Sequence, residues 1–110
     1  MHKIIRYYEI PLEKVDLGEN VDAVAKEYNL AGDESFGTGI LEVRGGEYLL
    51  DSSKWDEALY VIDGSISFIE DGVIKTARKG DIVWTPRGTK SKVVVDDYVK
   101  AFYVIRPFGA

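Results

Sequence analysis

The amino-acid sequence predicts an all-β protein, a sandwich or barrel of short antiparallel strands with one short helix before it. From residue 40 onward, short apolar or alternating segments are separated by closely spaced turn sequences, which is typical of such folds. The chain has 110 residues, enough for one domain with one core. We expect residues 35–110 to form the barrel and residues 1–34 to supply a strand and a helix that pack on it.

The helix is predicted over residues 21–28. Asn20, just before it, is a residue type favoured as a helix N-cap. The apolar residues that follow lie at the i, i+3, i+4 and i+7 positions of one helical face: Val21, Val24, Ala25 and Tyr28. The polar face shows no chemical grouping, so we expect a structural helix on the outside or rim of the barrel.

The strands are predicted from their apolar content and from the turns between them. They cover residues 65–69, from 73 onward, 81–85, 92–95 and 98–105. The turns that separate them carry Asp71-Gly72, Pro86-Arg87-Gly88 and Asp96-Asp97. An Asp-Gly pair favours a tight hairpin, and a proline fixes its own φ while a following glycine can adopt a positive φ.

The composition excludes several classes of partner. Nineteen acidic residues stand against 14 basic ones, and the basic residues are scattered, so we expect no nucleic-acid partner. The one local basic concentration, between Lys75 and Lys92, is interpreted as the solvated side of alternating strands. There is no cysteine, no signal peptide and no stretch of transmembrane length. We therefore expect a cytoplasmic protein that has no membrane partner.

Two segments bounded by glycines have a fixed spacing. The first contains Gly45, Asp51, Ser53, Glu57 and Gly64. The second contains Gly80, Pro86, Gly88, Ser91 and Val95. With these spacings, residues 35–108 resemble the cupin superfamily, which implies a double-stranded β-helix, or jelly-roll, barrel.

Three further segments, residues 55–64, 80–88 and 102–107, look most like the EutQ-like ethanolamine-utilisation cupins. Cupins include isomerases, dioxygenases, lyases, sugar binders and seed storage proteins, so the resemblance specifies the fold more closely than the function. For the EutQ-like group it implies a link to ethanolamine catabolism and bacterial microcompartments, with an acetate kinase activity.

The usual metal ligands of this fold are missing. The resemblance implies histidines at positions 51, 53 and 91 and a carboxylate ligand at position 57, but here those three positions hold Asp51, Ser53 and Ser91. The only histidine is His2, and serine hydroxyls are poor ligands for transition metals. We predict no catalytic metal and no cofactor.

Glu57 is then the candidate general acid or base, with Asp56 beside it. Alternate residues of a barrel strand point inward, so an inward Glu57 would be desolvated among Leu59 and Val61, which raises the pKa of a carboxyl group. Asp56 faces the other way in a regular strand, and a bulge would bring both inward. The alternative is that Glu57 is only held by a hydrogen bond and has no catalytic task.

Six further residues are candidates for binding a substrate. They are Asp51, Ser53 and Ser91 at the positions of the missing metal ligands, Trp55 and Trp84 as aromatic walls, and Tyr48 as a hydroxyl donor. Core packing is the alternative role for Trp84. Tyr60 and Ile62 would face outward on the barrel sheet, which predicts a homodimer that covers them.

Three functions remain open. The first is a metal-independent cupin that binds a compact polar metabolite and moves a proton on it with Glu57, as an isomerase, cyclase or lyase does. The second is a EutQ-like protein with acetate kinase activity, although Gly37-Thr38-Gly39 is too short for a phosphate-binding loop. The third is a non-catalytic module whose barrel only holds a ligand.

Overall fold

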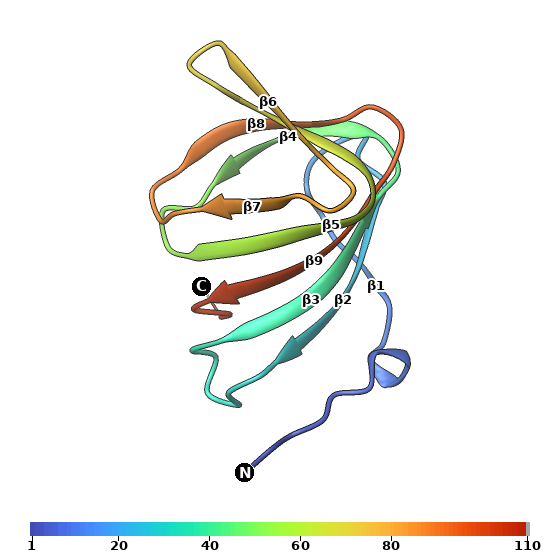
Figure 1. The fold of residues 1–110 in the computed structure, drawn as a ribbon, viewed down its shortest axis with the longest axis vertical. Coiled ribbons are helices and arrows are strands. Elements are labelled where there is room, and N and C mark those ends of the chain that lie inside the picture. Colours follow the sequence, from blue (N-terminus) through green and yellow to red (C-terminus); the bar gives the residue numbers. More distant parts are fainter. Residues whose placement is uncertain (110) are drawn as a thin grey trace.

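A computed structural model describes residues 1–109 and is almost entirely β (Figure 1). In this part of the chain the only helix is a short 3-10 turn, η1 (Tyr7–Glu9). The strands are β1 (Glu13–Lys14), β2 (Ala23–Asn29), β3 (Gly37–Val43), β4 (Gly46–Asp51), β5 (Asp56–Glu70), β6 (Val73–Arg78), β7 (Ile82–Thr85), β8 (Lys90–Val95) and β9 (Val99–Arg106). The all-β prediction is confirmed. Within residues 1–109 we find no helix with the length and apolar character needed to span a membrane.

Strand β5 joins two antiparallel sheets because it is 15 residues long and bends in the middle. Its first half pairs with β7 and β9, and the larger sheet continues through β3, β2 and β1. Its second half pairs with β6 and β8, and β8 also pairs with β4. The pairing with β9 shifts register between Val61 and Asp63. Gly64 follows with a φ of 76°, and a Cβ there would collide with the carbonyl oxygen of Tyr98. The bend therefore requires glycine.

The core lies between the two sheets and is rich in valine. The most deeply buried side chains include Val43, Val61, Val93, Val95 and Val99. On β8 the pattern alternates, since Ser91, Val93 and Val95 are buried while Lys90 and Lys92 are exposed. Such alternation identifies one inward face on each strand, and burying a valine contributes roughly 1.5–3 kcal/mol. The curl of the sheets around this core is visible in Figure 1.

The helix predicted over residues 21–28 is wrong. Most of this segment is β2, which pairs with β3 from Ala23–Val43 to Asn29–Gly37. Asn20 does not cap a helix; it has a φ of 62° in the turn before the strand. Ala23 and Ala25 are buried on one face of this strand, and pairing satisfies the backbone groups of β3. Residues before 35 thus contribute strands to the larger sheet, and the expected boundary at 34/35 falls between two paired strands.

Candidate functional site

Glu57 opens onto a cavity of about 320 Å³ between the two sheets. It lies near the start of β5, and the residues of the same parity, Leu59 and Val61, are buried in the core. The strand geometry therefore turns the carboxyl group inward. Mainly apolar and aromatic side chains surround it: Leu17, Leu41, Leu50, Ile66, Phe68 and Ile105.

Burial in this cavity raises the pKa of Glu57 to about 7. The main cause is desolvation, which penalises the charged form, and the negative charge of Glu27 adds to it. A carboxyl group with this pKa is present in both protonation states near neutral pH. It can therefore accept or donate a proton under physiological conditions.

Glu27 and Tyr103 form a second polar group in the same cavity. The Tyr103 hydroxyl donates a hydrogen bond to Oε2 of Glu27. The sheet register explains this contact, because Glu27, Gly39 and Tyr103 are successive partners on β2, β3 and β9. A Cβ on Gly39 would lie 2.5 Å from the Tyr103 hydroxyl oxygen, so the glycine lets the tyrosine ring cross β3 to reach Glu27. Burial first, and then this hydrogen bond, raise the pKa of Tyr103, which stays a neutral donor.

Sequence reasoning missed Glu27 because its segment also fits a helical period. On a helix, Glu27 would belong to a solvated polar face. On β2 it has the same parity as Ala23 and Ala25 and lines the Glu57 cavity, although the residue itself is exposed. No local signal indicated it, because residues 23–27 do not alternate between apolar and polar types.

Tyr48 and Trp55 line the cavity that holds Glu57. Burial, and then the charge of Glu57, raise the pKa of Tyr48 to about 12, so its hydroxyl is a neutral hydrogen-bond donor at pH 7. Trp55 is half-buried and offers an apolar wall. These two residues, with Glu57, form the part of the expected site that the fold brings together.

Asp56 lies outside this cavity. It begins β5 and faces away from Glu57, and the register shift in β5 comes later, between Val61 and Asp63. Its Oδ1 accepts a hydrogen bond of 2.7 Å from the backbone N–H of Arg87. Its Oδ2 is 3.6 Å from Nη2 of Arg87 and 3.4 Å from Nε of Arg106. Asp56 thus ties the turn after β7 to β5 and β9, which is a structural task.

Asp51, at the end of β4, and Ser53, just after it, do not come together with Ser91 in one site. Asp51 is exposed at the rim of the Glu57 cavity, where its carboxylate accepts a hydrogen bond from the backbone N–H of Ser53, itself exposed. The inward residue is Ser52, which is fully buried. Its hydroxyl donates to the Pro86 carbonyl and accepts from the Thr89 backbone N–H. Ser52 therefore holds the loop between β7 and β8, a role that no sequence motif indicated.

Trp84 and Ser91 line a second cavity, of about 540 Å³, which shares only Phe68 with the first one. The side chain of Trp84 is 58% exposed, so core packing does not describe it. Ser91 is buried on the inward face of β8. The structure therefore separates these two residues from Glu57.

The residues present do not fit the metal site implied by the fold. Within residues 1–109 no group of three or more His, Cys, Asp or Glu side chains is placed to hold a metal ion. Asp51 and Ser53 are exposed, and Ser91 lines the other cavity. We route no chemical step through a metal.

Comparison with known families gives a consistent result. Residues 3–109 match the family described as "Ethanolamine utilisation protein EutQ". A protein of Clostridioides difficile (strain 630) named "Acetate kinase EutQ" is 32% identical over 98 residues, which cover 86% of this chain. They cover only 61% of that protein, so this chain spans less than two thirds of its curated relative.

Solved structures agree on the fold. The Clostridium difficile EutQ structure superposes with a TM-score of 0.77 at 28% identity, covering 86% of this chain and 70% of that one. A putative ethanolamine utilization protein of Salmonella typhimurium LT2 gives 0.81 at 18% identity, covering 96% and 85%. An RmlC-like cupin from Shewanella frigidimarina gives 0.70 at 18% identity, covering 97% and 92%. The predicted cupin fold is confirmed.

Proposed function

We propose, since the chain belongs to the EutQ family of cupins, that it binds a compact polar metabolite in the Glu57 cavity and transfers a proton on it without a metal. The observation that carries the proposal is a carboxyl group with a pKa of about 7 in a largely apolar cavity. Keeping an unpaired acid there costs stability, and such costs are concentrated at functional sites. The reaction class is isomerisation, cyclisation or elimination.

The residues around the cavity suit proton transfer next to a carbonyl group. Glu57 in its ionised form removes the proton; the electron pair of the broken C–H bond forms a C=C bond, and the π pair of the carbonyl group moves onto its oxygen. Tyr48, a neutral donor in the same cavity, is the group available to stabilise that oxygen. Glu57 then returns the proton to a different carbon of the conjugated enolate while the oxygen's electron pair re-forms the C=O bond, which completes an isomerisation. Trp55 supplies an apolar wall against the ligand.

The experiment is deuterium exchange, which detects removal of a proton from carbon whatever product the reaction forms. The protein is incubated in D₂O with a panel of small oxo- and hydroxy-carboxylates, and incorporation at carbon is followed by NMR. We expect at least one compound to exchange faster than in buffer, and Glu57→Gln to abolish this exchange. Asp56→Asn is the matched control, because Asp56 lies outside the cavity. Exchange that survives in Glu57→Gln would remove the acid–base role.

Acetate kinase activity is the second candidate, and the name of the Clostridioides difficile relative favours it. The site gives little support. Gly37-Thr38-Gly39 lies within β3 and not in a loop before a helix, so it offers no phosphate cradle. Formation of acetyl phosphate from acetate and ATP, measured with Mg²⁺ present, tests this candidate. Turnover that Glu57→Gln leaves intact would favour it over proton transfer.

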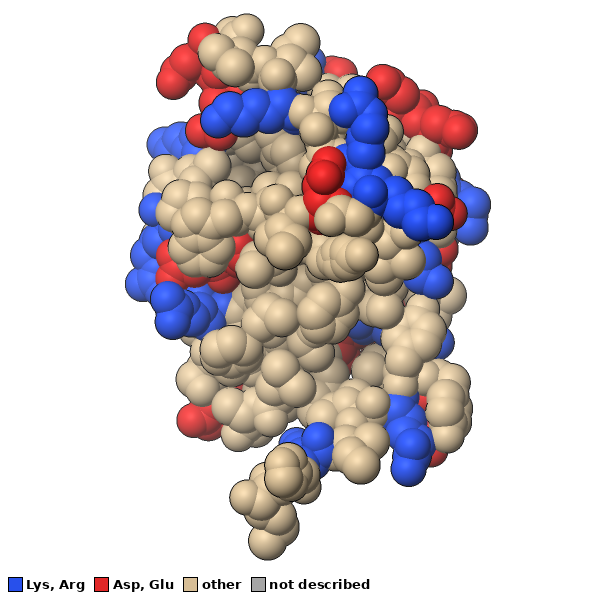
Figure 2. Space-filling model, viewed as in Figure 1, with Lys and Arg blue, Asp and Glu red and all other residues tan. Residues whose placement is uncertain are grey.

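We also propose that the protein is a homodimer. Exposed apolar side chains lie together on the outer face of the larger sheet: Tyr60, Ile82, Trp84 and Phe102. Tyr60 is the cross-strand partner of both Ile82 and Phe102. Figure 2 shows a broad central area without charged side chains on the face that it presents. Sedimentation should give twice the chain mass, and Phe102→Lys should give a monomer; a monomeric wild type would refute the proposal.

A further inference from the structure

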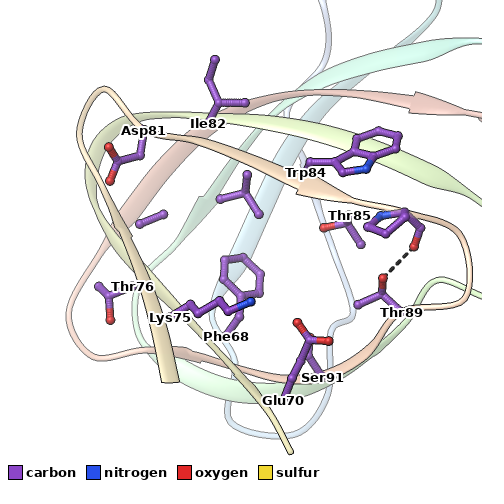
Figure 3. A pocket seen from close by; sticks show the side chains of 13 residues that line it. Phe68, Glu70, Lys75, Thr76, Asp81, Ile82, Trp84, Thr85, Thr89 and Ser91 are labelled. Carbon is purple, nitrogen blue, oxygen red and sulfur yellow. Dashed lines mark hydrogen bonds between the residues drawn. The ribbon is translucent and has the colours of Figure 1, made fainter. Parts of the chain in front are cut away.

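The second cavity is larger than the Glu57 cavity, and the proposed proton transfer does not use it. It measures about 540 Å³ and is bounded by the β5–β6 hairpin, β7 and the start of β8 (Figure 3). Phe68 lies between the two spaces, since it is the one residue that lines both. A volume of this size is within the range of small-molecule sites.

Two opposite charges extend into this cavity without pairing. Lys75 is the cross-strand partner of Phe68, and Glu70 is two residues along the same strand as Phe68, so both charged side chains share the face of the hairpin that lines the cavity. Lys75 is exposed there and Glu70 is half-buried. Figure 3 shows both side chains extending into the open space. Across residues 1–109 the ion pairs are Arg87–Asp56, Lys92–Glu47 and Arg106–Asp56, so neither Lys75 nor Glu70 is neutralised by a neighbour.

Asp81, the other charged residue of the lining, is already engaged. Its carboxylate accepts a hydrogen bond of 2.8 Å from the backbone N–H of Arg78. The lining therefore carries the cation of Lys75 and the anions of Glu70 and Asp81, of which Asp81 is held by the backbone. Lys75 and Glu70 lie on the same wall and are too far apart to form an ion pair with each other. A ligand that carries both a positive and a negative charge fits this arrangement better than an anion alone, because the carboxylate of Glu70 would repel an anion.

The wall opposite the hairpin supplies hydroxyl groups. Ser91 is buried, and its Oγ has no hydrogen-bond partner among the described residues. Thr89 donates its hydroxyl to the Pro86 carbonyl at 2.7 Å and keeps its oxygen free to accept. Leaving a buried hydroxyl unpaired is unfavourable, and a serine hydroxyl can turn about χ1 to meet a ligand.

We propose that this cavity binds a compact zwitterion, a small α-amino acid whose carboxylate contacts Lys75 and whose ammonium contacts Glu70. Its polar end receives a hydrogen bond from Ser91. The site is separate from Glu57, so it does not depend on the proton-transfer proposal.

The test is to measure binding of L-serine to the full chain by calorimetry or by NMR titration. We expect Lys75→Met and Glu70→Gln each to weaken binding about tenfold, since each removes a charge-assisted contact. L-Lactate, which lacks the ammonium, and L-serinamide, which lacks the carboxylate, should also bind about tenfold more weakly. Glu57→Gln is the control and should bind L-serine as the wild type does.

The proposal fails if the wild type does not bind L-serine, if L-lactate binds equally well, or if Lys75→Met and Glu70→Gln leave the affinity unchanged. Loss of binding in Glu57→Gln would instead place the ligand in the other cavity. Ser91→Ala gives an independent check. Removal of an unpaired hydroxyl should preserve or raise the melting temperature while binding weakens, and a fall of several degrees would show that Ser91 is bonded within the fold.

Discussion

Asp56 and Glu57 are neighbours in the chain and carry the same chemical group, yet they lie in opposite environments. Asp56 faces outward and contacts the Arg87 backbone N–H and two guanidinium groups. Glu57 faces inward, where desolvation and the charge of Glu27 raise its pKa to about 7. The difference comes from strand parity alone. It shows that adjacent carboxylates need not form a catalytic pair: one holds the structure and the other is available for chemistry.

The largest expected effect is on the rate of proton exchange, which should depend strongly on Glu57 and little on Asp56. Glu57→Gln should lower the rate of proton exchange by at least about a hundredfold, because general acid–base catalysis contributes on that scale or more. Asp56→Asn should change the rate by less than about threefold when both variants are folded. The rates come from the NMR exchange assay with whichever compound the panel identifies. Equal losses in the two variants would contradict the comparison.

The second expected effect is on stability as a function of pH. The folded protein holds the Glu57 proton up to a pKa of about 7, while the unfolded chain releases it near an ordinary value of about 4.3. Between these values the folded state binds more protons, so the free energy of unfolding falls as pH rises.

We expect a loss of about 2–3 kcal/mol between about pH 5 and pH 8 from this group alone. Urea unfolding of the wild type and of Glu57→Gln measures it, since the glutamine variant lacks this contribution. The variant should gain stability relative to the wild type as pH rises through 7. Parallel pH curves for the two proteins would show that Glu57 titrates normally.

A smaller effect is expected at Asp56. Asp56→Asn weakens one charge-assisted hydrogen bond and removes two partly exposed ion pairs, so it should cost about 1 kcal/mol of unfolding free energy. Chemical denaturation at pH 7 measures this cost. The titration midpoint of Glu57 should stay unchanged, and a shift would indicate that the two carboxyl groups are electrostatically coupled.

The smallest expected effect concerns the causes of the raised Glu57 pKa. Glu27→Gln removes a neighbouring negative charge and should lower the Glu57 pKa, which should remain above the ordinary glutamate value because burial is the larger cause. Glu47→Gln is the control, since Glu47 is exposed and paired with Lys92 at 3.0 Å. An unchanged Glu57 midpoint in Glu27→Gln would exclude this electrostatic contribution.

The fold could be predicted from the sequence because its signals are local. The turn at Asp71-Gly72 has positive φ values, as the Asp-Gly pair indicates. The helix prediction failed because residues 21–28 fit a helical period and carry no alternation of apolar and polar residues that would indicate a strand. The pairing of β2 with β3, which makes this segment a strand, is a tertiary contact.

The site was only partly predictable, because its geometry also depends on tertiary contacts between strands. The sequence left open whether Glu57 points inward; in the structure this direction follows from the parity of β5. The parity of β4 was not inferable, because nothing local indicates that Tyr48 and Leu50 face inward and Leu49 and Asp51 outward. The contact between Tyr103 and Glu27 depends on the register of three strands, two of which are far apart in sequence.

The most direct measurement is the titration of the Glu57 side-chain carboxyl carbon by NMR in the wild-type protein, assigned by its absence in Glu57→Gln. The account predicts an apparent pKa of about 7, well above the ordinary glutamate value of about 4.3. A midpoint near the ordinary value would show that Glu57 is solvated or paired. It would contradict the claim that this residue is the acid–base group of the barrel.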